Sequence, residues 1–279
     1  MRLEFTKMHG IGNDYIYIDC IKKNVELDAE TIVKLSDRNF GIGSDGVIFI
    51  GPSVVADGKM DMYNADGSSS QMCGNGIRCV GKFLYDRGYV QGSTVMIETP
   101  SGTKKLEMLV ADGVATGATV DMGTAVLECA EIPVNYSGSN VDIPITVGRR
   151  SYTMTCVSMG NPHAVVFVDD VKQIDISSIG PMFENHSMFP ERVNTEFIRV
   201  ISNTELDMRV WERGSGETLA CGTGACAAVV AAVLNGYCEY DQTVTVHLLG
   251  GDLKVDYSKN GDVAMTGDAV EVYNGYAEM

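Results

Sequence analysis

The sequence has little positive charge, no long apolar run and no secretion-signal pattern, and each absence excludes a class of protein. Lys and Arg total 21 against 37 Asp and Glu, which gives a formal net charge of −16. Phosphate groups and anionic lipids require a basic patch, so neither nucleic acid nor a membrane is expected as a partner. The longest apolar run, Ala225 to Leu234, is far shorter than the roughly 18 residues of a membrane span. We expect a soluble, cytoplasmic protein.

Cysteine occurs eight times, yet the sequence contains no CxxC pair and no histidine-rich companion segment. In a reducing compartment this pattern indicates free thiols and argues against a disulfide framework or a zinc site, so we expect no metal. Most of the cysteines are expected to be small buried hydrophobic residues, namely Cys20, Cys79, Cys129, Cys156, Cys226 and Cys238. Cys73 and Cys221 are the exceptions, because they lie in a repeated motif.

The tetrapeptides that begin at Cys73 and Cys221, Cys-Gly-Asn-Gly and Cys-Gly-Thr-Gly, are near copies separated by 148 positions (221 − 73). The same shift, without a gap, superposes Asn13 on Asn161 and Met60 on Met208. A repeat of this length indicates a duplicated domain, since the repeats of solenoids span roughly 20–50 residues. If the two halves face each other across a cleft, the cysteines approach one ligand from opposite sides, as inversion of a carbon centre by two acid/base groups requires.

Each copy of the motif begins a predicted helix. Unpaired backbone N–H groups and the positive end of the helix dipole favour a thiolate there, so one cysteine can be charged at neutral pH while its counterpart stays protonated. The same N–H groups can hold the α-carboxylate of an amino acid. The α-carbon would then lie between the sulfur atoms, and two helix ends would stabilise the charge that spreads into the carboxylate when the α-proton leaves.

Short β-like runs rich in Val, Ile, Tyr and Phe dominate the rest of the sequence. The predicted strands are Tyr15–Asp19, Val47–Ile50, Lys59–Tyr63, Val95–Glu98, Lys104–Val110, Ala164–Val168, Glu196–Val200, Leu206–Trp211, Thr243–Leu248 and Asp252–Tyr257. Helices are predicted over Asp28–Arg38, Ile77–Arg87, Ile174–Phe183 and Ala225–Asn235, with Asp28 as an N-cap. The last helix is apolar on every face, so protein should surround it. The pattern predicts an α+β fold of two pseudo-symmetric domains, each a curled, barrel-like, mostly antiparallel or mixed sheet around a central helix.

The duplication and the length of 279 residues predict two domains whose boundary lies near Val120–Thr124. The repeat leaves residues 267–279 as a tail, in which Ala269–Tyr273 has strand alternation. We expect this strand to return to the first domain. The N-terminal domain is therefore predicted to comprise residues 1–121 plus 267–279, and the C-terminal domain residues 122–266.

One glycine-rich segment does not have the context of its motif. Gly41–Gly46 matches the dinucleotide pattern GxGxxG, but it precedes the β-like run Val47–Ile50 instead of following a strand and opening a helix. We therefore do not expect a nicotinamide cofactor. No lysine stands in a context that marks it for a pyridoxal Schiff base, and we expect no cofactor.

Five segments together resemble the signatures of the diaminopimelate epimerase family. They are Met72–Gly76, Gly160–Ala164, Val193–Glu196, Trp211–Gly214 and Ala220–Ala225. The resemblance covers the whole chain. It implies a homodimeric enzyme, independent of pyridoxal phosphate, that interconverts LL- and meso-diaminopimelate in lysine and cell-wall biosynthesis. It also implies two β-barrel-like domains, each around a central helix.

The family pattern makes Cys73 and Cys221 the catalytic acid/base pair, and it makes His163 and Glu212 partners that tune the thiols. It places the polar ends of the substrate against Asn13, Asn64, Gly74, Asn75, Asn161, Asn194, Glu212, Arg213, Gly222 and Thr223. Arg213 can bind a carboxylate bidentately, and asparagines and Glu212 can meet ammonium groups. Many relatives carry Gln where this chain has Gly46, so a side-chain contact to the substrate is expected to be lost. Tyr273 resembles a tyrosine of the family's dimer interface.

Other interpretations stay open at this point. A racemase of the same superfamily could act on proline, hydroxyproline or another amino acid, although Asn75 and the region of Arg213 favour diaminopimelate. A thiol redox protein, a metal-binding protein or a non-catalytic ligand-binding module would use the same cysteines without turnover. Incorporation of solvent deuterium, tested over a panel of amino acids, separates these possibilities.

Overall fold

The computed structural model describes residues 2–70 and 72–278 of the chain. It divides into two compact units. The first contains the residues up to Asp121 and those from Thr266 onward, and the second is Met122–Met265. The chain passes from the first unit to the second within strand β8 (Val114–Thr124) and returns within β17 (Asp262–Asp268).

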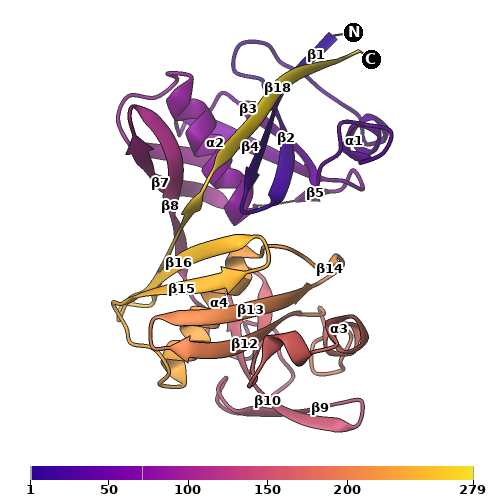
Figure 1. Ribbon diagram of the computed structural model, residues 1–279, viewed down its shortest axis with the longest axis vertical. Helices are drawn as coiled ribbons and strands as arrows, with labels where there is room; N and C mark the ends of the chain where they lie inside the picture. Colours follow the sequence, from indigo (N-terminus) through magenta and orange to yellow (C-terminus); the bar gives the residue numbers. More distant parts are fainter. Residues whose placement is uncertain (1, 71, 279) are drawn as a thin grey trace. The chain divides into compact units, whose positions relative to one another are not determined.

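The first unit is a mixed sheet with one helix against its inner face (Figure 1). Besides β8, its strands are β1 (Arg2–Gly10), β2 (Asn13–Asp19), β3 (Gly46–Gly51), β4 (Gly58–Asn64), β5 (Ser69–Ser70), β6 (Thr94–Thr99), β7 (Gly102–Ala111) and β18 (Val270–Glu278). They pair in the order β18–β1–β2–β3–β4–β6–β7–β8, with β5 on β4, and the pairs β2–β3 and β4–β6 are parallel. Helix α1 (Ala29–Ser36) connects β2 to β3, and α2 (Gly74–Asp86) is the central helix.

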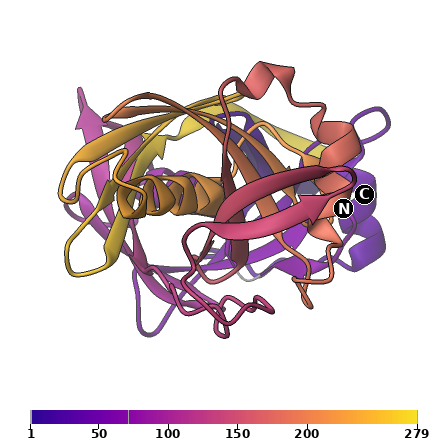
Figure 2. The same ribbon diagram turned by 90° about the horizontal axis from the view of Figure 1, so that it is seen from below.

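The second unit repeats this arrangement. Its strands are β9 (Ile143–Val147), β10 (Arg150–Ser158), β11 (Pro162–Phe167), β12 (Asn194–Ser202), β13 (Glu205–Glu212), β14 (Gly216–Glu217), β15 (Thr243–Leu248) and β16 (Gly251–Tyr257). They pair in the order β9–β10–β11–β12–β13–β15–β16, with β14 on β13, and β11–β12 and β13–β15 are the parallel pairs. The helical segments are η1 (Val171–Gln173), α3 (Ile176–Glu184) and the central α4 (Gly222–Leu234), which the strands of its unit surround in Figure 2.

The two central helices carry the cores of their units. Ala225–Ala232 of α4 is completely buried, which confirms that this helix is surrounded by protein. Its Ala, Val and Cys side chains are uncharged, so burial on all faces leaves no charge to compensate. Helix α2 is buried as well over Gly74–Leu84, but it includes the charged residues Arg78 and Lys82. The two central helices are therefore buried to a similar extent, but only α2 brings charged residues into its core.

The ends of the helices follow the predicted signals. Asp28 caps α1, since its Oδ1 accepts a hydrogen bond from Thr31 N at 2.8 Å. Gly88 and Gly236 lie just past α2 and α4 with φ of 69° and 75°, the left-handed conformation that ends a helix. Both central helices begin three residues before the predicted positions, because the glycines after each cysteine already belong to the first turn.

The strand predictions are confirmed in part. The tail strand returns to the first unit as β18 and pairs antiparallel with β1 (Figure 1). No strand was expected at β1, β8, β9, β10 or β17. Strand β8 contains several Ala and Gly residues with low strand propensity, and β1 alternates charged and apolar residues. Strand β8 pairs with β17 and β1 pairs with β18, both distant in sequence, whereas β9 and β10 form a hairpin that the sequence analysis missed.

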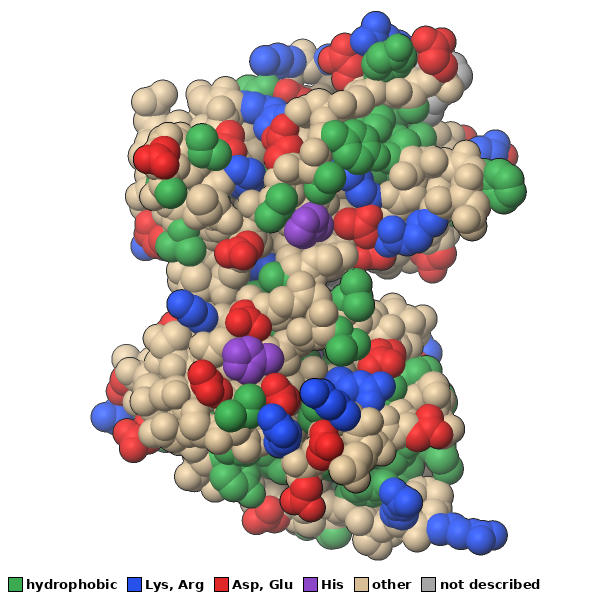
Figure 3. Space-filling view, in the orientation of Figure 1, with side chains coloured by type: hydrophobic (Ala, Val, Ile, Leu, Met, Phe, Trp, Pro, Cys, Tyr) green, Lys and Arg blue, Asp and Glu red, His purple; other side chains and the backbone are tan. Residues whose placement is uncertain are grey.

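The surface carries charges of both signs. In Figure 3, acidic and basic side chains are interspersed over the visible faces of both units. Over residues 2–70 and 72–278, no helix combines the length and the apolar character that a bilayer crossing needs.

Candidate active site

The two cysteines of the repeated motif occupy the same position in their units. Cys73 is the N-cap of α2 and Cys221 is the N-cap of α4, both with extended backbone angles, and each helix has 13 residues. Gly76 N donates to Cys73 Sγ at 3.4 Å. Each sulfur therefore lies beside the first turn of a buried helix, where backbone N–H groups lack helical partners. Cys73 is partly exposed, whereas Cys221 is buried.

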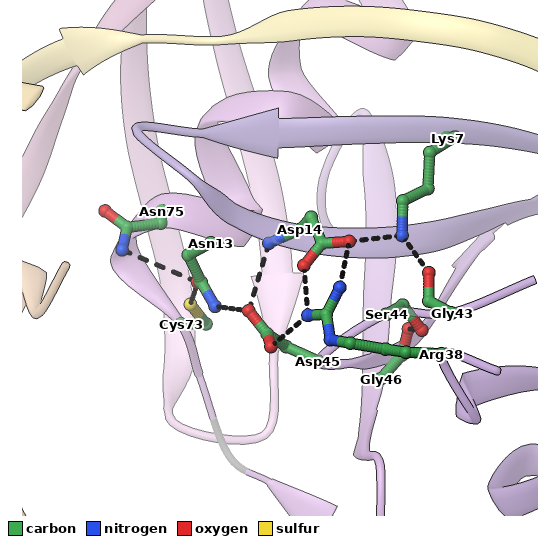
Figure 4. A network of polar contacts seen from close by, with 10 residues as sticks. All are labelled: Lys7, Asn13, Asp14, Arg38, Gly43, Ser44, Asp45, Gly46, Cys73 and Asn75. Carbon is green, nitrogen blue, oxygen red and sulfur yellow. Dashed lines mark hydrogen bonds and ion pairs between the residues drawn. The ribbon is translucent and has the colours of Figure 1, made fainter. Parts of the chain in front are cut away.

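In the first unit, Cys73 and Asn75 both contact the side chain of Asn13 (Figure 4). Cys73 Sγ donates to Asn13 Oδ1 at 3.2 Å, and Asn75 Nδ2 lies 3.5 Å from the same oxygen. Asn13 Nδ2 in turn donates to Asp45 Oδ2 at 2.7 Å. The amide of Asn13 thus joins the thiol to a carboxylate that the sequence did not identify.

Asp45 belongs to a charged network behind Asn13 (Figure 4). Arg38 Nη2 lies 2.8 Å from Asp45 Oδ1 and 2.6 Å from Asp14 Oδ1, and Lys7 forms a close ion pair with Asp14. Burial alone would raise the pKa of the Asp14 carboxyl, but the hydrogen bonds from Arg38 and Lys7 hold this pKa below its usual value. The network contains two carboxylates and two cationic side chains, so their formal charges balance.

Asn64 and Gly46 lie at the edge of this region, opposite each other in the β3–β4 pair. Asn64 Nδ2 donates to Ser68 Oγ at 3.0 Å in the turn before β5. Gly46 has φ of 156°, and a Cβ there would lie 2.0 Å from Tyr63 O. This backbone therefore leaves no space for a side chain at position 46.

Two carboxylates, those of Glu212 and Glu196, lie near Cys221 in the second unit. Burial raises the pKa of the Cys221 thiol well above its usual value, and the negative charges of Glu212 and Glu196 raise it further. Burial also raises the pKa of Glu212, although hydrogen bonds from Thr218 and Cys221 oppose that rise. At Cys221, burial and the two carboxylates therefore oppose the effect of the helix N-terminus, which favours a thiolate. This environment favours the protonated form of Cys221, the role expected of one cysteine of the pair.

His163 reaches the site through Asn161. The histidine is completely buried, with Nδ1 2.7 Å from Glu196 Oε1 and Nε2 3.0 Å from Asn161 Oδ1. Asn161 Nδ2 lies 3.4 Å from Thr223 Oγ1, in the first turn of α4. Thr223 Oγ1 is also 3.6 Å from Cys221 Sγ. A chain of polar contacts therefore runs from a buried carboxylate to the sulfur.

The remaining expected residues of the second unit lie near the end of β13. Asn194 Oδ1 accepts from Arg213 N at 2.9 Å, and Asn194 Nδ2 donates to Pro162 O at 2.9 Å. Asn194 thus holds two backbone segments in place. The Arg213 guanidinium is partly exposed, and its Nη1 donates to Glu191 O at 2.9 Å. Gly222 is the first residue of α4 and lies between Cys221 and Thr223.

The repeat relates positions that carry different chemistry in the two units. A shift of 148 positions places Tyr15 on His163, Ile48 on Glu196, Asn64 on Glu212 and Arg78 on Cys226. The second unit therefore has two carboxylates and an imidazole beside its cysteine. At the same positions the first unit has neutral groups, together with a buried guanidinium in α2. The duplication conserves the cysteines and their asparagines but not their electrostatic surroundings.

Sequence reasoning missed Glu196 and Asp45, and both had a detectable signal. Glu196 lies within the motif Val193–Glu196, and an acidic residue in an otherwise apolar strand indicates a buried partner. A Cβ on Gly224 would lie 2.7 Å from Glu196 Oε1, so the last glycine of the second tetrapeptide makes room for this carboxylate. Asp45 lies within Gly41–Gly46, which had been considered only as a cofactor motif.

None of the eight cysteines, all of which lie in the described part of the chain, forms a disulfide. Within the part of the chain that the structure describes, no three His, Cys, Asp or Glu side chains form a cluster that could hold a metal ion. The groups gathered at the two helix ends are thiols, amides, carboxylates and an imidazole, which can bind and transfer protons.

Comparison with known proteins identifies relatives over the full length. The chain matches the family described as diaminopimelate epimerase over residues 5–128 and 155–272. It is 51% identical over 282 residues to the diaminopimelate epimerase of Acetivibrio thermocellus, covering 99% of each chain. It is 50% identical over 275 residues to that of Methanococcus maripaludis, covering 98% of this chain and 99% of the relative.

Solved structures share the fold at lower sequence identity. A probable proline racemase from Agrobacterium radiobacter has a TM-score of 0.72 at 15% identity, covering 99% of this chain and 92% of that one. A phenazine biosynthesis protein from Bacillus anthracis has a TM-score of 0.71 at 15% identity and covers both chains completely. The predicted fold of two pseudo-symmetric units, each with a sheet around a central helix, is confirmed.

Proposed function

We propose, because this chain belongs to the diaminopimelate epimerase family, that Cys73 and Cys221 carry out the proton transfers of the epimerase reaction. The chain is an isomerase of lysine biosynthesis, and diaminopimelate is its substrate. One observation supports the assignment above all others. Cys73 and Cys221 are the N-cap residues of equivalent central helices.

The proposed reaction inverts the α-carbon that links LL- and meso-diaminopimelate. One thiolate takes the α-proton, and the electron pair of the broken C–H bond moves into the α-carboxylate. Backbone N–H groups at the helix ends stabilise the resulting negative charge. The opposite thiol then gives its proton to the other face of the carbon and is left as a thiolate. The reverse reaction exchanges the two roles.

Electrostatics support Cys221 as the proton donor. Burial, Glu212 and Glu196 raise its pKa, so it holds a proton at neutral pH. Cys73 takes the role of the base. The buried guanidinium of Arg78, which donates to Gly74 O at 3.1 Å, lies within electrostatic range of Cys73 and favours its thiolate. Position 226, which corresponds to Arg78 in the repeat, is a cysteine.

We propose that the amide, carboxylate and guanidinium groups around the thiols bind the two amino-carboxylate ends of the substrate. The backbone N–H groups after each cysteine bind the reacting carboxylate. Arg213 binds the distal carboxylate, while Glu212 and the asparagine side chains bind ammonium groups. The residues assigned to binding are Asn13, Asn64, Gly74, Asn75, Asn161, Asn194, Glu212, Arg213, Gly222 and Thr223, and His163 acts through Asn161.

Solvent isotope exchange tests the role of the cysteines. LL-diaminopimelate is incubated with the protein in deuterated water, and loss of the α-proton signal is followed by NMR. Both Cys73→Ala and Cys221→Ala should lose epimerisation by at least a thousandfold, whereas Cys238→Ala should retain it. Epimerisation at the wild-type rate in both single variants at positions 73 and 221 would show that other groups move the proton.

We further propose a cytoplasmic homodimer. Tyr273 packs edge-on against Phe5 with ring centroids 5.9 Å apart, yet it is 44% exposed, and Val272 and Tyr276 on the same strand are exposed too. Exposed apolar side chains along one strand are suited to an interface. Eight cysteines without a disulfide suit a reducing compartment. Sedimentation of the wild type and of Tyr273→Ser tests the dimer, which the substitution should weaken.

A further inference from the structure

We infer that Asp45 is a positioning residue that orients the side-chain amide of Asn13, so that the amide oxygen accepts the proton of the Cys73 thiol. The inference rests on the proposed role of Cys73 in catalysis. It concerns the state of that thiol before substrate binds. It also gives a function to Gly41–Gly46, the glycine-rich segment without the context of a cofactor motif.

The chemistry of the carboxylate decides which way the amide points. An ionised carboxylate only accepts hydrogen bonds, so the Asn13 atom that lies 2.7 Å from Asp45 Oδ2 has to be the NH₂ group. The oxygen of the same amide then has to face the other way. That oxygen lies 3.2 Å from Cys73 Sγ, as Figure 4 shows. The orientation thus follows from the partners of Asn13.

Asp45 itself is held on several sides. Its Oδ2 accepts from Asp14 N at 3.1 Å, and its Oδ1 pairs with Arg38 Nη2 at 2.8 Å. Its backbone N donates to Asp14 O at 2.8 Å, and its carbonyl accepts from Ala65 N at 2.9 Å. A carboxylate fixed in this way imposes its own position on Asn13. The segment Gly41–Gly46 places a carboxylate behind the amide instead of binding phosphate.

The orientation of Asn13 decides which form of Cys73 is favoured. A thiol donates its proton to the amide oxygen, whereas a thiolate faces the same oxygen with like partial charge. Cys73 is the cysteine of this chain that is not buried, and thiolates are the form that oxidants and alkylating agents attack. Asp45 and Asn13 therefore shift the balance at the accessible Cys73 toward the thiol in the free enzyme and make it less reactive, while the thiolate stays available as the base.

Other ionisable groups also lie near Cys73. Tyr15 and Tyr17 on β2 and Cys79 on α2 lie within electrostatic range, and burial raises the pKa of each, so all three are neutral at neutral pH. Arg78 on α2 is positive and favours the thiolate. Asp45, behind Asn13, is the negative group that the substitution below removes. Asp45 and Asn13 thus act against Arg78 and the helix N-terminus.

Alkylation by iodoacetamide without substrate tests the inference. The rate is measured from pH 6 to pH 10, and mass spectrometry of the peptide that contains Cys73 identifies the labelled thiol. In Asp45→Asn the new amide can donate to Asn13 Oδ1, so the amide of Asn13 can turn its NH₂ toward the sulfur. The midpoint of the pH profile should fall by about one unit, which raises the rate at neutral pH about tenfold. An unchanged midpoint would overturn the inference.

Two further variants separate orientation from the simple loss of a negative charge. Arg38→Met removes the exposed partner of Asp45 but leaves the carboxylate on Asn13, so the midpoint should not fall. In the Asn13→Ala background, the Asp45→Asn shift should shrink to less than half, since the amide that transmits it is gone. A full shift in that background would mean that Asp45 acts through its charge alone. These measurements need no turnover, so their outcome is independent of the isotope-exchange result for the cysteines.

Discussion

His163 and Glu196 form a completely buried pair, in which the imidazole Nδ1 lies 2.7 Å from the carboxylate Oε1. The second oxygen of Glu196 has no hydrogen-bond partner among the described residues. Removal of its partner would leave the buried carboxylate without a compensating contact, which strongly destabilises the fold. Both ring nitrogens of His163 face oxygen atoms, Nδ1 that of Glu196 and Nε2 that of Asn161, so the ring links the two side chains. The pair thereby fixes which end of the Asn161 amide faces Thr223.

Replacing Glu196 with Gln should therefore change the hydrogen bonds of the His163 ring and the orientation of Asn161. A neutral amide binds Nδ1 more weakly than a carboxylate does, so the ring and the Asn161 amide that it contacts are no longer held in one orientation. We expect KM for diaminopimelate to rise about tenfold, corresponding to about 1.4 kcal/mol of lost binding. The ¹⁵N shifts of His163 should change, because they report the hydrogen bonds of both ring nitrogens.

A matched substitution separates this effect from loss of any carboxylate in the second unit. Glu217 pairs with Arg209 at 2.8 Å, lies near the surface and makes no contact in the His163 chain. Glu217→Gln should leave both KM and the His163 shifts at their wild-type values. If Glu196→Gln leaves the ¹⁵N shifts of His163 unchanged, the carboxylate does not control the ring, and the chain of contacts has only a packing role.

The sequence predicted the features of the site that the duplication and local signals encode. Cys73 and Cys221 were identified because the repeat aligns them, and the helix they begin is visible from the apolar run after Cys221. The N-cap at Asp28 is a local hydrogen bond to Thr31, so residue type and spacing were sufficient. The tail strand Val270–Glu278 was recognised from its alternation.

The features that the sequence could not predict depend on neighbours that are distant along the chain. The high pKa of Cys221 comes from burial and from Glu212 and Glu196, none of which a local pattern relates to the thiol. The contact between Asn13 and Asp45 joins residues 32 positions apart. Likewise, β8 has poor local propensity and pairs with β17, which is distant along the chain, as well as with its neighbour β7.

Alkaline pH should destabilise the fold through Cys79 in α2. Burial raises the pKa of this thiol from 9.0 to about 11, so the folded state holds the proton to higher pH than the unfolded state does. Stability is therefore full below about pH 9 and is lost as the pH rises to about 11. A difference of two units corresponds to about 2.7 kcal/mol at most. Urea unfolding from pH 8 to pH 11 should show a steeper loss for the wild type than for Cys79→Ala.

The comparison with Cys79→Ala isolates one thiol. Other groups with raised pKa, such as Cys156 and Tyr17, contribute equally to both proteins and cancel in the difference. The alanine variant is less stable at every pH, because it leaves a small cavity. Parallel curves for the two proteins would show that ionisation of Cys79 does not contribute to alkaline unfolding.

Substitutions at two glycines should distinguish close backbone approach from conformational preference alone. A Cβ at Gly46 would lie 2.0 Å from Tyr63 O and 3.0 Å from Asn64 Cα, so Gly46→Ala has to push β3 away from β4. At Gly88, φ is 69° and no atom lies within 4 Å of the added carbon, so Gly88→Ala has only the left-handed backbone to oppose it. We expect losses of more than about 3 kcal/mol and of about 1 kcal/mol, respectively, in the free energy of unfolding measured with urea. Equal losses at both positions would mean that the β3–β4 pair can relax around a side chain at position 46.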